Sequence, residues 1–263
     1  MAQASDQADD LTSCAQLVER GDAERFRATM AAPPAARAAL FPIYAFNLEV
    51  SRAPWVTQEP MIAEMRLQWW RDALEEIREG GPVRRHEVAT PLAKVLDATG
   101  AELLDALIDA RRWDIQKEPF EDEADFRAYI EATSANLLLA ATRALAPHVP
   151  EAPVRKAGHA LGVANWLRAV PALEAAGRIP LVDGRPEAVR ALAQDGLRLL
   201  AEARRERSAI PAAARPAMLA VWHAGPVLAA AARHPARVAD AALDPAPFRD
   251  RLSLMARAST GFW

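Results

Sequence analysis

The stretch LFPIYAFNLEVSRAPW, Leu40 to Trp55, begins as an apolar, aromatic segment and ends in a half-polar turn. Its first half is typical of a helix buried in a core, because no charged residue interrupts it. Its second half places Glu49, Ser51 and Arg52 on the same helix, and a proline then ends it. A half-polar turn at the end of a core helix raises the question of an active site.

The rest of the chain has a helical period. Leu103, Leu104, Leu107 and Ile108, for example, mark one buried face, and prolines and glycines separate such segments. No run of alternating β-branched residues is long enough for a strand. The sequence therefore predicts an all-α fold of about ten helices joined by short loops.

The domain organisation is predicted from the length of the chain and from the positions of its linkers. The chain of 263 residues is long enough for a sizeable core, and no long polar linker divides it. We expect residues 1–12 to form a flexible N-terminus and residues 13–263 to form a single helical domain. The proline-rich segment 147–153 is predicted to be a loop between two helices.

Composition excludes several classes of protein. A net charge of −3 does not favour a nucleic-acid binder, and the single Cys14 excludes an intrachain disulfide. No window approaches 18 uninterrupted apolar residues, and the acidic N-terminus is unlike a secretory signal, so we expect a cytoplasmic location. Phosphate-binding glycine loops are missing, and the five histidines have no metal-ligand spacing.

A second segment stands out: GHALGVANWLRAVPALEAAGRIPL, Gly158 to Leu181. Asn165 and Arg168 share one face of this predicted helix. Small residues recur near its start, which lets a neighbouring helix approach closely: Gly158, Ala160, Gly162 and Ala164.

Together and in this order, the two segments resemble the squalene/phytoene synthase family. The family's aromatic entry before its first Asp-rich turn and its G-x-A-L-x-x-x-N-x-L-R helix are both recognisable, and three shorter blocks lie in order between them. The matching residues are Tyr44-Ala45-Phe46, Arg66 to Arg71, Trp113-Asp114, Tyr129, Gly158 to Arg168 and Gly177-Arg178. The resemblance covers about residues 35–181. It implies a single-domain helical bundle of the isoprenoid synthase type.

The departures from the family pattern concern catalysis. In active members, two Asp-rich motifs hold the Mg²⁺ ions that grip the substrate diphosphates, and Mg²⁺ prefers such oxygen ligands. The motif positions here hold Ser51, Trp55, Ala169 and Leu173, none of which supplies a carboxylate. The resemblance therefore implies no catalytic residues, no metal and no cofactor. The sequence leaves open whether Trp55 and Leu173 fill the old substrate cavity.

A narrower resemblance follows from A-F-N-x-E at Ala45 to Glu49 and from the segment Met65 to Trp70. Both are similar to a branch of the family that lacks the catalytic aspartates. In mitochondria, that branch is represented by an assembly factor for NADH dehydrogenase, respiratory complex I. The resemblance implies a non-catalytic binding or assembly protein, whose partner is a complex I subunit or an assembly intermediate.

The residues expected to line the cavity, or to bind there, come from the same matched blocks. Glu49 and Arg52, three residues apart on one helix, are candidates for an ion pair. The full set is Tyr44, Asn47, Glu49, Arg52, Asp114, Tyr129, Asn165 and Arg168.

Two alternatives stay open. An active head-to-head prenyl transferase acting on prenyl diphosphates would need Glu49, Asp114 and Glu174 as substitute Mg²⁺ ligands. A carrier of an apolar ligand, such as a prenyl lipid or quinone, would use the family's hydrocarbon cavity. A peripheral location at the inner membrane is a further expectation, although we expect the aromatic pair Phe262-Trp263 to pack onto the bundle.

Overall fold

The computed structural model describes residues 2–57, 59–116, 118–244 and 247–263, with side chains except at 2–8 and 247–250. No strand occurs in these residues, which confirms the predicted all-α class. One-turn helices, too short to show a period, make the helices more numerous than predicted. The elements are α1 (Ala2–Gly21), α2 (Ala23–Ala31), α3 (Pro34–Arg52), α4 (Pro60–Arg78), α5 (Ala89–Leu92), α6 (Ala98–Arg111), α7 (Trp113–Gln116), α8 (Glu123–Ile130), the π-helical turn η1 (Glu131–Ala135), α9 (Asn136–Leu145), α10 (Glu151–Ala175), α11 (Pro186–Arg205), the 3₁₀ turn η2 (Arg207–Ala209), α12 (Arg215–Met218), the 3₁₀ turn η3 (Leu219–Val221), α13 (Ala224–Arg233), α14 (Ala236–Ala239) and α15 (Pro247–Thr260).

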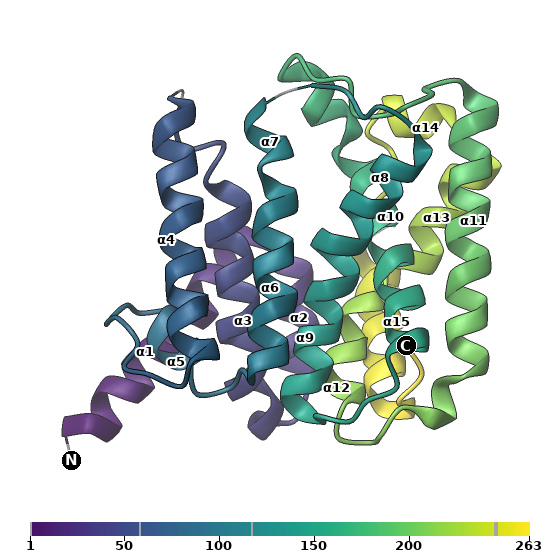
Figure 1. Ribbon diagram of the computed structural model, residues 1–263. Helices are drawn as coiled ribbons and strands as arrows, with labels where there is room; N and C mark the ends of the chain where they lie inside the picture. The colour runs from purple at the N-terminus through teal and green to yellow at the C-terminus, as the bar shows by residue number, and fades with distance from the viewer. Residues whose placement is uncertain (1, 58, 117, 245–246) are drawn as a thin grey trace.

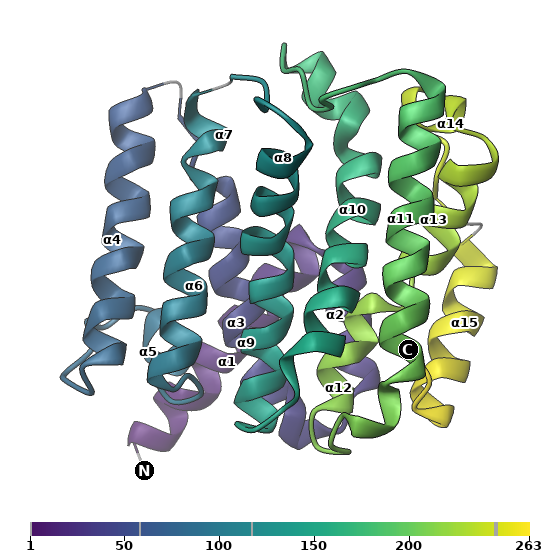
Figure 2. The ribbon, with the colours of Figure 1, turned by 45° about the vertical axis from the view of Figure 1, so that its right-hand side comes forward.

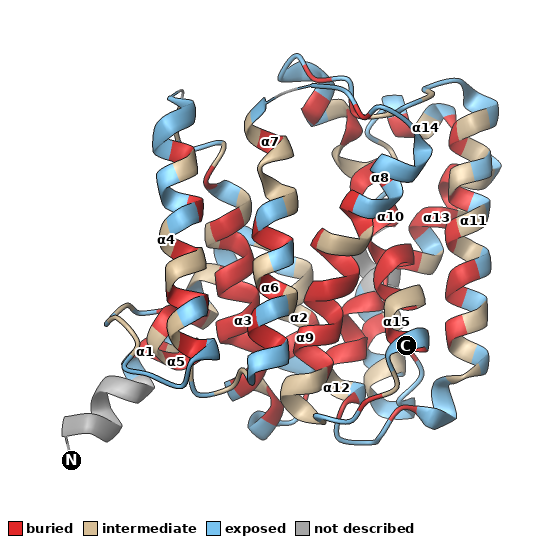
Figure 3. Ribbon diagram, viewed as in Figure 1, coloured by how far each residue is buried: buried red, intermediate tan, exposed pale blue. Residues whose placement is uncertain are grey.

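The helices form one bundle. Helix α4 lies at one edge and α11 at the opposite edge, with α3, α6, α9 and α10 between them (Figures 1 and 2). The inward faces of these helices are buried (Figure 3). Buried apolar side chains from Cys14 to Trp263 form one continuous cluster. Burial of this surface is the main stabilising contribution to the fold.

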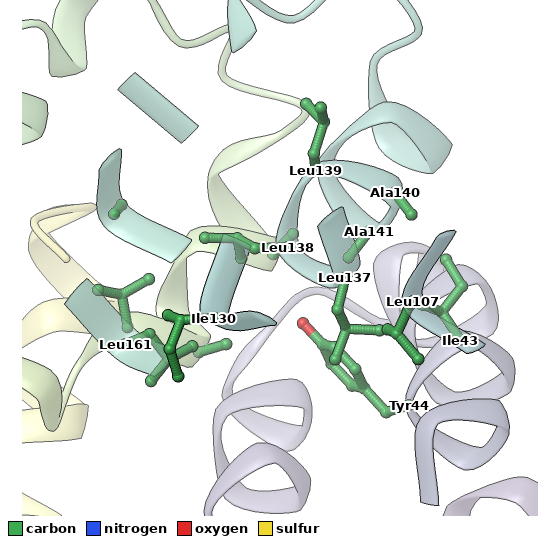
Figure 4. Packing of buried hydrophobic residues seen from close by; sticks show 14 of the residues in the cluster. Ile43, Tyr44, Leu107, Ile130, Leu137, Leu138, Leu139, Ala140, Ala141 and Leu161 are labelled. Carbon is green, nitrogen blue, oxygen red and sulfur yellow. The ribbon is translucent and has the colours of Figure 1, made fainter. Parts of the chain in front are cut away.

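Helix α3 runs through the core because its sequence is apolar on nearly every side. It begins at Pro34, where a missing backbone N–H costs nothing, and its middle is buried. Figure 4 shows Tyr44 of α3 packed beside Leu137 of α9 and near Leu107 of α6. The helix ends at Arg52, just before the next proline in the chain. This ending leaves the half-polar turn at the end of the bundle, where Arg52 and Trp55 are exposed.

Helices α8 and α9 are joined without a break by the π-helical turn η1. Within it, Thr133 Oγ1 donates to the carbonyl of Tyr129 at 2.7 Å, and Ser134 Oγ donates to the carbonyl of Gly158 at 2.8 Å. A Cβ on Gly158 would lie 2.6 Å from Ala135 Cα, so this close contact requires glycine. The close approach predicted from the small residues of α10 is confirmed. Such π-helical turns are frequent at functional sites.

The chain ends are anchored to different extents. In α1, Asp10 is buried and its Oδ2 lies 2.7 Å from Arg85 Nη1, so the end of the segment 1–12 is held in the bundle. Trp263 is buried as expected, whereas Phe262 stays 38% exposed. The predicted loop between α9 and α10 is confirmed up to residue 150, whereas residues 151–153 already form the start of α10. Among the described helices, none combines the length and apolar composition needed to cross a bilayer.

Candidate functional site

A cavity of about 990 Å³ lies between the end of α3, α7, the α8–η1 segment and α10. Most of the residues singled out from the sequence converge on it. Tyr44 and Glu49 do not line it. The other ten do: Asn47, Ser51, Arg52, Trp55, Asp114, Tyr129, Asn165, Arg168, Ala169 and Leu173.

The four positions that the resemblance matches to the family's aspartates all line this cavity. Ser51 and Trp55 lie at and just after the end of α3, and Ala169 and Leu173 lie on α10. The Ser51 hydroxyl is used locally and donates to a carbonyl of its own helix at 3.2 Å. Trp55 is 47% exposed, and its ring centroid lies 4.8 Å from the Arg178 guanidinium carbon. Trp55 and Leu173 therefore line the cavity without closing it.

A buried cluster of three side chains occupies one wall. Arg111 Nη1 donates to Tyr129 Oη at 2.7 Å and to Asp114 Oδ2 at 3.1 Å. Tyr129 Oη in turn donates to Asp114 Oδ1 at 3.0 Å. Burial, reinforced by the Asp114 carboxylate and opposed by Arg111, raises the pKa of Tyr129 well above its ordinary value. The phenol therefore stays protonated, and the Asp114 carboxylate is fully engaged within the protein.

Arg168, on α10, also lines the cavity and is neutralised from two sides. Its Nη1 lies 2.7 Å from Glu24 Oε2, at the start of α2, and its Nε lies 2.6 Å from Asp244 Oδ1. Burial disfavours the charge, but these two carboxylates raise the pKa of Arg168 above its ordinary value. The cation is thus committed to internal ion pairs.

His223 is buried beside the same group. Its Nε2 lies 2.9 Å from Asn165 Oδ1 and 3.3 Å from Glu24 Oε2. Because both neighbours are oxygen acceptors, the neutral ring carries its proton on Nε2. Burial lowers the pKa of His223 to about 4; Glu24 opposes this effect and Arg168 adds to it. At neutral pH the ring is therefore uncharged.

This histidine makes stability depend on pH. The unfolded chain takes up a proton as the pH falls through 6.5, whereas the folded protein resists until about pH 4. The unfolded state then binds more protons, so the free energy of unfolding falls as pH decreases over this window. Between pH 6.5 and about pH 4, His223 lowers the free energy of unfolding by about 3 kcal/mol, and we expect His223→Gln to abolish this contribution. Urea unfolding at several pH values measures it, with the exposed His234→Gln as control; equal slopes in both variants would contradict the assignment.

Tyr44 and Asn47, both on α3, differ in whether they line the cavity. Tyr44 is buried and does not line the cavity; the Arg25 guanidinium carbon lies 5.6 Å from its ring centroid, and burial raises the pKa of Tyr44 to about 12. Arg25 itself pairs with Asp22, the N-cap of α2, at 2.6 Å. Asn47 does line the cavity, and its buried Oδ1 has no hydrogen-bond partner in the described residues. The side-chain oxygen of Asn47 is therefore free to accept a hydrogen bond from a molecule in the cavity.

The predicted ion pair between Glu49 and Arg52 does not form. Arg52 lines the cavity mouth, and its Nη2 would lie 3.0 Å from a Cβ placed on Gly21. The side chain thus turns toward the end of α1, away from Glu49, which lies outside the cavity. Three residues of separation on a helix permit a pair but do not enforce it.

The residues present do not fit a Mg²⁺ cluster. Each carboxylate that lines the cavity is paired with an arginine: Asp22 with Arg25, Glu24 and Asp244 with Arg168, and Asp114 with Arg111. Of the substitute acids considered from the sequence, Glu49 and Glu174 lie outside the lining. Within the described residues, no group of three or more potential ligands is arranged to hold a metal.

Several residues of the site were missed from the sequence. The pairing of Arg111 with Asp114 could have been predicted, because the two residues are three positions apart on a helical segment. The pairing of Glu24 with Arg168 could not, because Glu24 lies 144 residues from Arg168 and meets it only through the fold. The other missed polar residues in the lining are Asp22, Arg25, Arg27, Thr133, Ser134, His223 and Asp244.

Solved structures resemble the whole chain. A dehydrosqualene synthase in complex with ligand superposes with a TM-score of 0.81, at 16% identity over 97% of each chain. The squalene synthase HpnC from Alicyclobacillus acidocaldarius gives a TM-score of 0.69, at 20% identity over 85% of this chain and 93% of that one. At these identities, the likeness establishes the fold.

Curated relatives resemble part of the chain. The Drosophila melanogaster "NADH dehydrogenase (ubiquinone) complex I, assembly factor 6 homolog" is 33% identical over 170 residues, 60% of this chain and 50% of that protein. The human assembly factor 6 is 26% identical over 163 residues, 60% of this chain and 48% of that protein. The chain spans about half the length of these relatives. The family description "Squalene/phytoene synthase" matches residues 18–182, and the chain belongs to the squalene/phytoene synthase family.

Proposed function

We propose that this protein is a non-catalytic member of the family that acts as a binding or assembly factor for respiratory NADH dehydrogenase. The observation that carries the proposal is the pairing of every carboxylate in the cavity lining with an arginine, beside four family positions that lack a carboxylate. The names of the curated relatives support the partner: a complex I subunit or an assembly intermediate.

The chemistry of the family reaction explains why this pairing matters. A departing diphosphate carries several negative charges, and metal ions bridged to carboxylates stabilise its departure. Here Asp114 is held by Arg111 and Tyr129, and Arg168 is neutralised by Glu24 and Asp244. A diphosphate would have to compete with these ion pairs, and breaking the buried pair of Arg111 and Asp114 is costly. We propose that the protein works without Mg²⁺ or another cofactor.

The proposed location is the cytoplasm, peripheral at the inner membrane. NADH dehydrogenase is the target that the relatives' names suggest, and a factor for it must reach that complex. Nucleic acid is not proposed as a partner, because the net charge is −3.

A carrier of an apolar lipid or prenyl ligand is the second candidate, and the volume of the cavity favours it. About 990 Å³ lies at the upper end of the range for small-molecule sites, and Leu161, Trp166 and Leu173 contribute apolar surface. Native mass spectrometry of protein purified from its own host would show a retained lipid. Protein without bound lipid in that spectrum would dismiss the carrier.

A direct assay tests the absence of catalysis. The purified protein is incubated with Mg²⁺ and farnesyl or geranylgeranyl diphosphate, and we expect pyrophosphate release equal to the blank without enzyme. An active squalene synthase serves as the positive control. A bound substrate would also stabilise the fold, by about 2.7 kcal/mol at a hundred times its Kd, and we expect no such shift in thermal unfolding. Turnover above the blank would refute the proposal.

A further inference from the structure

A second pocket, of about 530 Å³, lies where the end of α11 meets the segment after α15. It shares no lining residue with the central cavity. Three arginines line it: Arg205 from α11, Arg207 from η2 and Arg215 from α12. Figure 2 shows the lower ends of α11 and α15 near the C-terminus. This pocket gathers positive charge on a protein whose net charge is negative.

Two further arginines lie next to the pocket and surround the ring of Phe262. The guanidinium carbons of Arg204, Arg207 and Arg257 lie 5.4, 5.2 and 5.8 Å from its centroid. An aromatic face attracts such cations, but it supplies no net negative charge. The five guanidinium groups around this pocket are therefore only partly compensated by the ring.

No carboxylate side chain that the structure describes neutralises these arginines. Elsewhere in the protein arginines pair with acids, but in the described residues none of the five has an Asp or Glu side chain within 4 Å. Arg204 Nε donates to the Trp263 carbonyl at 2.7 Å, while Arg204 Nη2 and Arg257 Nη1 are buried without a partner. A single carboxylate at Trp263 would still leave most of the group unpaired. Burial and the neighbouring Arg257 lower the pKa of Arg204 to about 10, as expected where positive charges crowd together.

Exposed apolar side chains lie on α15, the helix whose end lines this pocket. On α15, Leu252 is 50% and Met255 is 68% exposed, and three residues of spacing put them on one face. Phe262, 38% exposed, follows the end of the helix at the pocket. Basic groups next to exposed apolar side chains are typical of surfaces that dock on anionic bilayers.

We infer that the α11–α12 connection and α15 form a docking surface for an anionic phospholipid membrane, with a lipid phosphate held by Arg205, Arg207 and Arg215. The charge of the pocket complements a phosphate, and guanidinium groups bind phosphate oxygens with two parallel hydrogen bonds. The exposed apolar side chains argue for a membrane as the source of that phosphate, because a phosphate in solution gains nothing from them. This surface deepens the peripheral location proposed above.

Vesicle co-sedimentation tests the inference without any partner protein, so its failure leaves the assembly role standing. We expect binding to vesicles of phosphatidylcholine mixed with phosphatidylglycerol, and little binding to phosphatidylcholine alone. Arg205→Gln/Arg207→Gln/Arg215→Gln should weaken binding about a hundredfold, because each arginine near an anionic surface strengthens binding about fivefold. High salt should weaken binding of the wild type by screening the same charges.

A matched control removes the same charge elsewhere. Arg20, Arg66 and Arg233 are exposed, and no carboxylate partner is found for them in the described residues. Their triple Gln variant should bind as the wild type does. Met255→Ser tests the apolar part and should weaken binding several-fold, while circular dichroism checks that each variant is folded.

Three outcomes would overturn the inference. The first is equal binding to neutral and anionic vesicles, and the second is an equal loss in both arginine triple variants. In the third, calorimetry shows that the protein takes up inorganic phosphate in solution, while anionic vesicles do not sediment it. That result would assign the pocket to a soluble phosphate compound.

Discussion

Arg111→Met should lower the free energy of unfolding by about 3–5 kcal/mol, because it leaves the Asp114 carboxylate buried and without its cation. The Asp114 side chain is only 4% exposed and that of Arg111 19%. Tyr129 would remain as a donor, but a neutral hydroxyl cannot replace a guanidinium group. Urea unfolding followed by circular dichroism measures the loss.

The neighbouring residue provides a matched control. Arg112 lies one position further on and pairs with Glu64 at 3.2 Å and Asp109 at 2.8 Å, but its side chain is 34% exposed. Exposed pairs contribute about 0–1 kcal/mol, so Arg112→Met should have a small effect. The double variant Arg111→Met/Asp114→Leu should recover much of the loss, because no buried charge then remains unpaired. Equal effects of the two single variants would contradict the description of the cavity wall.

Gly158→Leu should destabilise the protein by about 3 kcal/mol or more, because α10 then cannot seat against the π-helical turn. The new Cβ would meet backbone, Ala135 Cα at 2.6 Å, and backbone cannot move aside as a flexible side chain can. The change would also disturb the hydrogen bond from Ser134 to the Gly158 carbonyl. Thermal unfolding gives the change in Tm.

Gly225 in α13 is the matched helical glycine for that test. A Cβ there would lie 3.5 Å from a Leu200 methyl group, an ordinary contact. Gly225→Ala should be neutral or slightly stabilising, because alanine favours a helix more than glycine does. If Gly158→Ala and Gly225→Ala changed the Tm equally, the close approach of α10 to the π-helical turn would be refuted.

The long helices could be predicted from the sequence because their period is strong. Leu104, Leu107 and Ile108 mark the buried face of α6, and the prolines near residue 150 mark the start of α10. The π-helical turn could not be predicted, because EATSA has no composition that distinguishes it from a regular helix. One-turn helices such as α12 could not be predicted either, because four residues are too few to show a helical period in the sequence.

The cavity could be placed, but its electrostatics could not. Matching to the family put Asn165, Arg168 and the four altered positions on facing helices, and the structure brings them together. The pairing of Arg168 with Glu24 depends on how α2 packs beside α10, and no local pattern encodes it. The direction of Trp55 depends in the same way on Arg178, which is contributed by a distant loop.

Deletion of the gene in its own organism tests the central claim, that the fold serves assembly rather than catalysis. Assembled NADH dehydrogenase is measured on native gels, and carotenoids and hopanoids are profiled in the same cells. We predict loss of the assembled complex with an unchanged lipid profile, restored by a plasmid copy of the wild-type gene. A normal complex together with missing isoprenoid products would contradict the account.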